Sequence, residues 1–246
     1  MSIERSTAGT GIGAEHAPTP GATQAEAIDA TGVSPAMRIQ ILSTEHWSLL
    51  ASRSLAWNEV FSRSGMFLST LSGAIVALAL VGQASAFGDA FRLFGLVILP
   101  PVLFVGIGTV LRLGMANYHD ALCVVGMNRI RAAYLELAPD LRRYFVTGTY
   151  DDEASVAQTM GLEPNVPMAL QMVASSPMLI TVLNSLLFAA IWALALFQLG
   201  AGLVVALVVG AAAFLAAIVA HSWYAGRGIA RARRSLRPMF PPPPGL

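Results

Sequence analysis

The chain of 246 residues has no lysine, a single cysteine and only 12% charged residues. Because soluble domains carry about 25% charged residues, this shortage argues against a soluble globular protein. The single cysteine, Cys123, excludes an intrachain disulfide and leaves too few thiols for a cysteine-based metal cluster, so we expect it to be a small packed side chain. A net charge of +1 argues against nucleic-acid binding as the main role.

Charge is missing altogether from long segments of the sequence. No Asp, Glu, Lys or Arg lies between Glu163 and Arg227, and this run is too long for one membrane-spanning helix of about 20 apolar residues. The run fits two spans joined at residues 200–202. Two further charge-free segments, residues 65–87 and 93–111, fit one span each. The sequence therefore predicts an all-α integral membrane protein with four transmembrane helices.

Composition divides the chain into five regions. Residues 1–34 are rich in small residues and proline, and we expect a disordered tail without a signal peptide. Residues 35–138 are predicted to form a helical hairpin that holds the first two spans and extends from them into the cytoplasm. Residues 139–175 are expected to be a cytoplasmic loop with a short helix, residues 176–224 hold the last two spans, and residues 225–246 form a basic, proline-rich cytoplasmic tail.

Two apolar patterns lie in the cytoplasmic part of the predicted hairpin. The first helix is predicted to start with Ser34 as its cap and Pro35 in its first turn. It then carries a stripe at spacings of three and four, which is expected to pack against another helix or to lie on the membrane surface. The second helix is expected to continue past its span with a coiled-coil-like seam that pairs with this stripe, and to end at Pro139. The stripe consists of Trp47, Leu50, Ser54, Trp57 and Phe61, and the seam of Cys123, Met127, Ile130, Tyr134 and Leu137.

Both spans of the predicted hairpin carry a feature of their own. The first span has small residues four apart, at Gly65, Ser69, Gly73 and Ala77. Such a strip lets two membrane helices approach closely, so it predicts a helix contact within the protein or between subunits. In the second span, Pro100 and Pro101 remove backbone hydrogen bonds and predict a kink, either a gating hinge or a static bend.

The loop and the tail have weaker signals. Asp151 is expected to cap a short helix that Gly161 closes. Prolines at positions 164, 167 and 177 predict irregular chain from there to the third span. The proline run after the basic segment is expected to be extended and solvated.

The arginines predict the orientation of the four spans. Residues 1–64, 112–175 and 225–246 would share one side of the membrane, and they contain every basic residue except Arg92. Because basic residues concentrate in cytoplasmic loops, both termini are expected in the cytoplasm, with the protein in the plasma (inner) membrane.

No residue is assigned to catalysis, to a cofactor or to a metal. His119 and Asp120 are an adjacent pair of the kind found in metal-dependent phosphohydrolases, but the further ligands of such sites are missing, so we interpret them as solvated helix residues. Residues 151–153 have enough carboxylates for a divalent cation, yet they too are expected to be solvated. The spans contain no ionisable residue, which argues against a transporter, and Asn184 is expected to hydrogen-bond between helices.

Two stretches carry a resemblance to known families. HWSLLASRSLAWNEVFSRSGMFLSTLSGAIVALALV, followed by GMNRIRAAYLELAPDLRRYFVTG, resembles a group of actinobacterial integral membrane proteins over residues 39–148. That group lends no biochemical role. The order of a cytoplasmic helix, two spans and a long cytoplasmic helix is similar to the SLATT family, which implies a pore-forming effector of bacterial defence. This chain adds two spans to that layout, and no residue role is carried over.

The sequence thus favours a non-enzymatic protein of the lipid bilayer that forms a homo-oligomer, either a channel-like pore or a membrane-anchored interaction protein. The alternative is a membrane enzyme that acts on a lipid-like substrate at the cytoplasmic interface through His119, Asp120 and residues 151–153. That alternative requires these groups to lie within about 10 Å of one another. A small transporter is the third hypothesis.

Overall fold

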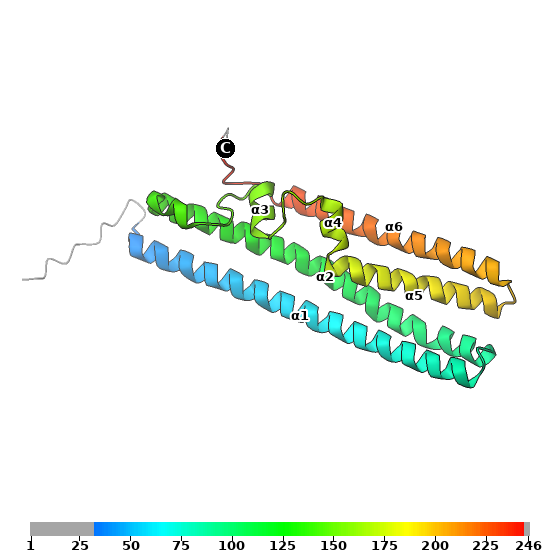
Figure 1. Cartoon of the computed structure of the whole chain (residues 1–246). Helices are drawn as coiled ribbons and strands as arrows, with labels where there is room; N and C mark the ends of the chain where they lie inside the picture. The colour runs from blue at the N-terminus through cyan, green and yellow to red at the C-terminus, as the bar shows by residue number, and fades with distance from the viewer. Residues whose placement is uncertain (1–31, 244–246) are drawn as a thin grey trace, which may run out of the picture. The chain divides into compact units, whose positions relative to one another are not determined.

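The computed structural model describes residues 32–243, and within this range the chain consists of helices and turns without a strand (Figure 1). The predicted all-α class is therefore confirmed for the described residues. The predicted disordered tail falls almost wholly outside them. The helices are α1 (Pro35–Ala84), α2 (Asp89–Leu137), the 3-10 helix η1 (Pro139–Tyr144), α3 (Glu153–Thr159), α4 (Met168–Val173), α5 (Ser176–Gln198) and α6 (Leu203–Ser235).

Residues up to Ile41 and residues from Leu42 onward form two separate units, and each is considered by itself. In the first unit, the start of α1 is as predicted. The Ser34 hydroxyl accepts a hydrogen bond from the Met37 N–H at 3.3 Å, and Pro35 occupies the first helical position, where a missing N–H costs nothing. Everything below concerns the second unit.

Four helices, α1, α2, α5 and α6, are long and apolar enough to cross a membrane. α2 has 49 residues and is about 75 Å long, and the part of α1 within this unit, residues 42–84, is about 65 Å long, so each exceeds twice the thickness of a bilayer core of about 30 Å. The polar segments on one side of their apolar parts therefore continue as helix. α2 passes Pro100 and Pro101 without a break in its helical assignment, and a kink there remains a prediction.

The turn between α1 and α2 consists of residues 85–88, because α1 ends at Ala84 and α2 already begins at Asp89, before the expected start of the second span at residue 93. Ala86 and Phe87 have φ angles of 50° and 58°, in the left-handed region that side chains seldom adopt. The Phe87 N–H returns to the Gly82 carbonyl at 2.8 Å. A Cβ at Gly82 would lie 2.6 Å from the Phe87 ring, so glycine at this position makes room for the ring under the turn.

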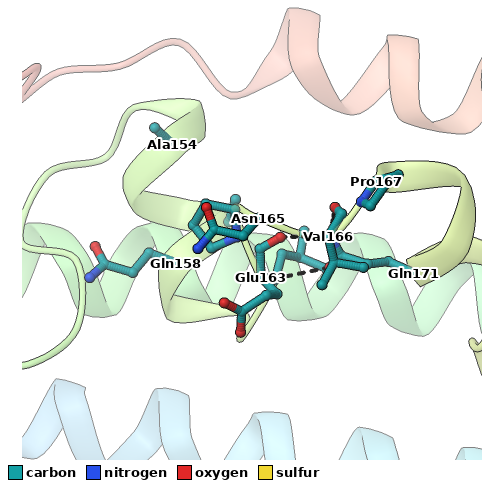
Figure 2. A pocket seen from close by; sticks show the side chains of 10 residues that line it. Ala154, Gln158, Glu163, Asn165, Val166, Pro167 and Gln171 are labelled. Atoms are coloured by element: carbon teal, nitrogen blue, oxygen red, sulfur yellow. Dashed lines mark hydrogen bonds between the residues drawn. The ribbon is translucent and has the colours of Figure 1, made fainter.

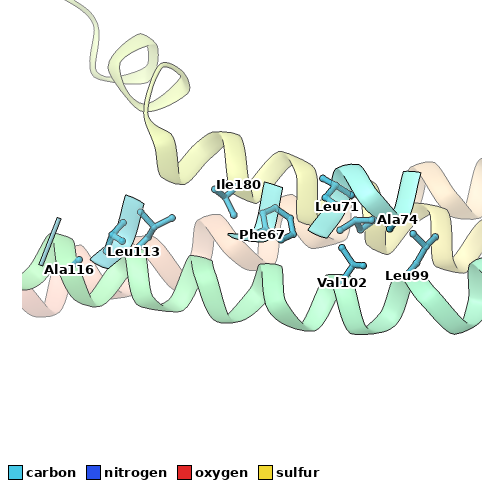
Figure 3. Packing of buried hydrophobic residues seen from close by; sticks show 10 residues of the cluster. Phe67, Leu71, Ala74, Leu99, Val102, Leu113, Ala116 and Ile180 are labelled. Atoms are coloured by element: carbon cyan, nitrogen blue, oxygen red, sulfur yellow. The ribbon is translucent and has the colours of Figure 1, made fainter. Parts of the chain in front are cut away.

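The apolar core lies where α1, α2 and α5 meet (Figure 3). Phe67 from α1 and Ile180 from α5 are almost fully buried in it. A Cβ at Gly106 of α2 would come within 2.6 Å of the Phe67 ring and 1.8 Å of the Asn184 Oδ1, so only glycine allows this approach of the three helices. The buried apolar members of this core are Val60, Phe67, Leu71, Ala74, Leu99, Val102, Leu113, Ala116, Ile180 and Leu187.

The predicted stripe of α1 is mostly not the packed face. Trp47 is 67% exposed and Phe61 is 59% exposed, whereas Val60 is buried. The contact face is turned by about one residue, because polar side chains of α1 find buried partners on α2. On α2 the predicted seam holds better, since Cys123, Met127 and Ile130 are buried while Leu137 is exposed.

The strip of small residues on α1 is also uncovered. Gly65, Ser69 and Gly73 are exposed, and a Cβ added at either glycine would meet no atom within 4 Å. Within the described residues, the strip is therefore not an internal helix contact. The other alternative from the sequence, a contact between subunits, is taken up below.

Three features of the loop and tail differ from expectation. The N-cap of α3 is Asp152, whose carboxylate accepts a hydrogen bond from the Ala154 N–H at 3.1 Å, so the prediction of Asp151 as the cap was wrong. Gly161 closes the helix with φ +77°, as predicted. The segment that was predicted to be irregular contains the short helix α4. Pro167 precedes this helix, and a proline at a helix start loses no backbone hydrogen bond. The basic segment after residue 225 continues α6 as helix to Ser235.

Candidate functional site

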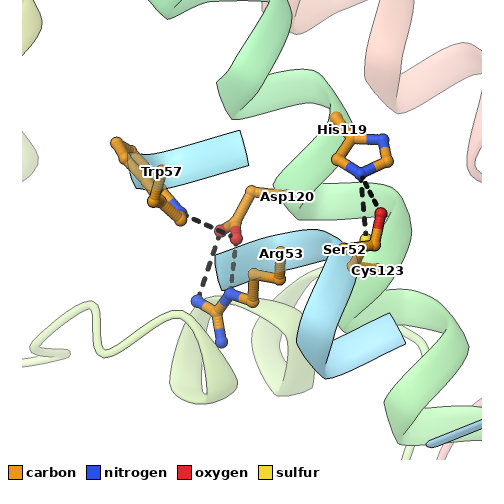
Figure 4. Close-up of polar contacts among 6 residues, drawn as sticks. All are labelled: Ser52, Arg53, Trp57, His119, Asp120 and Cys123. Atoms are coloured by element: carbon orange, nitrogen blue, oxygen red, sulfur yellow. Dashed lines mark hydrogen bonds and ion pairs between the residues drawn. The ribbon is translucent and has the colours of Figure 1, made fainter. Parts of the chain in front are cut away.

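A partly buried group of polar side chains joins α1 to α2 outside their most apolar parts, and we call it the polar layer. It contains Ser52, Arg53 and Trp57 from α1, and His119, Asp120 and Cys123 from α2 (Figure 4). Asp120 is only 2% exposed. Its Oδ1 accepts hydrogen bonds from Arg53 Nε and, at 3.0 Å, from Trp57 Nε1, and its Oδ2 accepts one from the other end of the Arg53 guanidinium at 3.3 Å.

The second half of the polar layer is centred on His119. Its Nε2 shares a hydrogen bond with the Ser52 hydroxyl at 3.0 Å and lies 3.6 Å from the Cys123 sulfur. Burial, and then the negative charge of Asp120, raise the pKa of the Cys123 thiol above its usual value. A buried thiol with a raised pKa is a poor nucleophile. Cys123 is thus the packed residue that the sequence predicted.

The prediction of a solvated His119–Asp120 pair was wrong. A buried carboxylate needs paired charge and hydrogen bonds, and Arg53 and Trp57 supply both. The sequence contained a signal for this arrangement. Asp120 lies three residues before Cys123 and therefore continues the alternating spacing of the α2 seam toward the N-terminus. That spacing places Asp120 on the buried face of the helix.

A second polar group holds the chain after α6 against α2 and the loop, and we call it the tail clamp. It consists of Arg129, Asp151, Met239 and Phe240. Asp151 is 4% exposed and accepts hydrogen bonds of 2.8 Å each from Arg129 Nε and from the backbone N–H groups of Met239 and Phe240. Burial alone would raise the pKa of Asp151, but these three donors together lower it below its usual value. Asp151 is therefore neither solvated nor a helix cap.

Next to the tail clamp, Asn128 ties the loop to α2. It is fully buried, and its Nδ2 donates to the Tyr150 carbonyl at 2.8 Å. Its Oδ1 accepts from Arg131 at 2.8 Å and from the Thr159 hydroxyl at 3.0 Å. Because every polar atom of this amide is used, the loop has a defined position on α2. Asn128 lies outside the periodic seam of α2, and a single asparagine fits an exposed helix position equally well, so no sequence pattern pointed to its role.

The groups of the enzyme site considered from the sequence have separate partners, because Asp120 binds Arg53 and Trp57, whereas Asp151 binds Arg129 and the tail. Asp151 binds beside Arg129, and the part of α2 between Asp120 and Arg129 is about 13 Å long. His46 lies beside Tyr134, with 6.3 Å between ring centroids, and His221 bonds to the Ala217 carbonyl of its own helix. Among the described residues, no group of three or more His, Cys, Asp or Glu side chains is arranged to hold a metal ion.

Asn184 differs from expectation in another way. It is fully buried in the contact of α5 with Gly106 and Phe67, but neither atom of its amide has a hydrogen-bond partner among the described residues. The prediction that Asn184 hydrogen-bonds between helices was therefore wrong. Because a buried polar group without a hydrogen-bond partner costs free energy, the Asn184 amide destabilises the helix contact that its side chain helps to fill.

An open groove of about 570 Å³ lies between α3 and the start of α4. Figure 2 shows Gln171 reaching back to the loop, where its amide donates to the carbonyls of Glu163 and Val166 at 2.9 and 2.8 Å. The groove is lined by apolar groups, two further amide side chains and the single carboxylate of Glu163. This lining does not indicate a reaction.

In the polar layer and in the tail clamp, both oxygens of the buried carboxylate accept hydrogen bonds from another segment, so each group joins distant parts of the chain. Comparison with known proteins adds no further constraint: no family model matches the chain, and neither a curated protein nor a solved structure is significantly similar to it.

Proposed function

We propose that this chain is a multi-pass protein of the plasma (inner) membrane, with four spans and both termini in the cytoplasm, which acts by associating with further copies of itself through α1. Four helices of suitable length and hydropathy support the spans. The near absence of arginine from residues 83–92 and 200–202 supports the orientation, because Arg92 is the one arginine there.

A single observation carries the self-association: one continuous surface of α1 is left uncovered. We call it the open face and define it by Trp47, Leu50, Phe61, Gly65, Ser69 and Gly73, all of which are exposed. Its first half lies beyond the apolar segment, where lipid tails would not cover tryptophan and phenylalanine. Its second half is made of small residues, which let another membrane helix come close.

A second copy of the chain is the occupant that fits both halves. A copy in the same membrane has the same orientation, so its α1 has aromatic residues in the cytoplasm and small residues in the lipid at the same heights. Two such faces related by a twofold axis along the membrane normal would cover each other. A soluble partner would reach only the aromatic half, and lipid would reach only the small half.

Gly73→Leu is the sharpest test of this proposal. The added side chain meets no atom of its own chain within 4 Å of the new Cβ, so the monomer should fold, while the close approach of a second α1 is blocked. Gly108→Leu is the matched control, since Gly108 is an exposed helical glycine with equally open space on α2. Mass measurement in detergent and energy transfer between labelled copies in liposomes should report an oligomer for the wild type and the control, and a monomer for Gly73→Leu. A strictly monomeric wild type would overturn the proposal.

A pore between copies is the second candidate. Ser69 and Ser72 are exposed in the apolar part of α1, and hydroxyl groups can line a path for ions. Ion flux through liposomes that contain the oligomer tests this candidate. An oligomer without flux would leave the interaction protein as the function.

A further inference from the structure

The cytoplasmic end of α6 is strongly basic on one face. Arg227, Arg231 and Arg234 follow one another at spacings of four and three, so their side chains project from the same side of the helix. Together with Ala230 they line a shallow hollow of about 270 Å³. α6 contains no acidic residue, and none of these three arginines forms an ion pair with a described residue. We call them the arginine triad.

The other face of the same helical end is fixed to the rest of the protein. Arg233 pairs with Glu153 of α3, and the carbonyl of Arg237 accepts a hydrogen bond from Arg129 at 3.3 Å. The tail clamp follows directly. The end of α6 is therefore held on one side, which leaves the arginine triad on the side that faces away from these contacts.

The position of the triad along α6 matches the headgroup layer of a membrane. Trp223 and Tyr224 are exposed at the end of the apolar segment, as are aromatic residues at membrane interfaces. The helical rise puts Arg227 about 5 Å, Arg231 about 10 Å and Arg234 about 15 Å past Tyr224. The headgroup layer on one side of a bilayer is about 5–8 Å thick, so Arg227 lies within it, and Arg231 and Arg234 follow past its outer edge. Side chains of a helix lean toward its N-terminus, which for α6 is the membrane side.

Arg227 is also held in a suitable orientation. Its guanidinium lies 4.2 Å above the centroid of the Trp223 ring. Stacking uses the flat side of a guanidinium and leaves its N–H groups free at the edge, where they can bind phosphate oxygens in pairs. From these observations we infer that the arginine triad is a binding site for the phosphate of an anionic phospholipid. This inference rests on the proposed membrane insertion but not on self-association.

The test compares two double variants that remove equal charge. Arg231→Gln with Arg234→Gln removes two members of the triad and keeps the Arg227–Trp223 contact, whereas Arg142→Gln with Arg143→Gln removes two exposed arginines of η1. Native mass spectrometry of the full chain, with dioleoyl phosphatidylglycerol or dioleoyl phosphatidylcholine added to the detergent, measures lipid retention. The wild type and the η1 variant should prefer phosphatidylglycerol, and the triad variant should lose that affinity about tenfold or more.

Each other outcome counts against the site. Equal loss in both double variants would show a general charge effect, and an absence of preference in the wild type would show no site; either result overturns the inference. Inorganic phosphate that stabilises the detergent-solubilised chain as much as phosphatidylglycerol does would reassign the triad to free anions. Release of the chain from membranes by alkaline carbonate would overturn membrane insertion and this inference together, whereas retention without lipid preference would overturn the inference alone.

Discussion

Asp120 is the residue on which the polar contact of α1 with α2 depends, because it joins a nearly buried carboxylate to donors on the other helix. Asp120→Asn keeps the size of the side chain but removes its charge. The amide NH₂ group that replaces one carboxylate oxygen would point at an N–H donor of Arg53 or Trp57. We expect this variant to lose about 2–4 kcal/mol of stability. Thermal or denaturant unfolding in detergent measures the loss. Arg63→Gln is the control, since the exposed Arg63–Glu59 pair should contribute no more than about 0.5 kcal/mol.

A double variant separates lost pairing from lost shape. Arg53→Met combined with Asp120→Leu replaces the whole pair by apolar side chains, and such replacements are often neutral. The double variant should therefore be more stable than Asp120→Leu alone. A double variant as unstable as the sum of its single variants would show that Arg53 and Asp120 do not act as a pair.

Asp151 makes the tail clamp sensitive to acid. The pKa of Asp151 is below its ordinary value of 3.8 in the folded protein, so its contribution to stability is complete above that value and is lost as the pH falls through the lower folded pKa. Pepsin should cut near Phe240 slowly at pH 4 and faster at pH 2.5 in the wild type. Asp151→Asn should be cut readily at both values, with a free peptide used to correct for the activity of pepsin. Equal cutting of both proteins at pH 4 would show that the carboxylate does not hold the tail.

At this scale, sequence reasoning recognised the packed Cys123 and the Ser34 cap but misjudged Asp120, Asp151 and Asn184. The first two of these three are acids that the fold brings to donors from distant parts of the chain, such as the backbone of Met239 and Phe240. No local pattern contains those donors. Asn184 was misjudged because its neighbours, Gly106 and Phe67, offer shape without hydrogen bonds.

Among the elements, the three-helix contact at Gly106 gives the clearest prediction. Gly106→Ala puts a methyl group within 1.8 Å of Asn184 Oδ1 and should cost about 1–3 kcal/mol, although alanine is the better helix former. Gly108→Ala, in open space on the same helix, should be neutral or stabilising. Unfolding in detergent compares the two variants. Adding Asn184→Ala to Gly106→Ala should restore part of the loss, and a failure to do so would mean that the clash is with another group.

The existence of the long helices was predictable, because charge-free runs, the Ser34 cap and the stop at Pro139 all agree with their observed positions. The packed face of α1 was not. Apolar side chains alone selected Trp47 and Phe61, but the helix turns its polar residues Ser52 and Arg53 toward α2. These few polar contacts turn the packed face of α1 by about one residue from the apolar stripe. A search for apolar periodicity does not detect such contacts.

For the whole molecule, the proposed orientation predicts which residues are reached from outside the cell. In a Cys123→Ala background, Asp89→Cys at the start of α2 should react with a membrane-impermeant maleimide in intact cells, because Asp89 is exposed beside the short α1–α2 turn. Asp140→Cys in η1 should react only after the membrane is permeabilised. The reverse pattern would invert the topology. The wild-type Cys123, only 2% exposed, should stay unlabelled until the protein unfolds.

The number of apolar helices and the all-α class could be read from composition, since the bilayer imposes length and hydropathy on each span. The relation of the loop to the tail could not. It depends on single contacts between Asn128 and Tyr150 and between Asp151 and Phe240, which are specified by the complete fold.

The tail clamp also has a consequence for biosynthesis. Arg237, whose carbonyl Arg129 binds, follows Arg129 by 108 residues in the chain. During translation, Asp151 and Arg129 can therefore pair with each other, but they lack their contacts with the tail until both α5 and α6 have been made. A ribosome that stalls within α6 would release a product with an open clamp, and a quality-control protease could distinguish it from the finished protein by the accessible loop around Asp151.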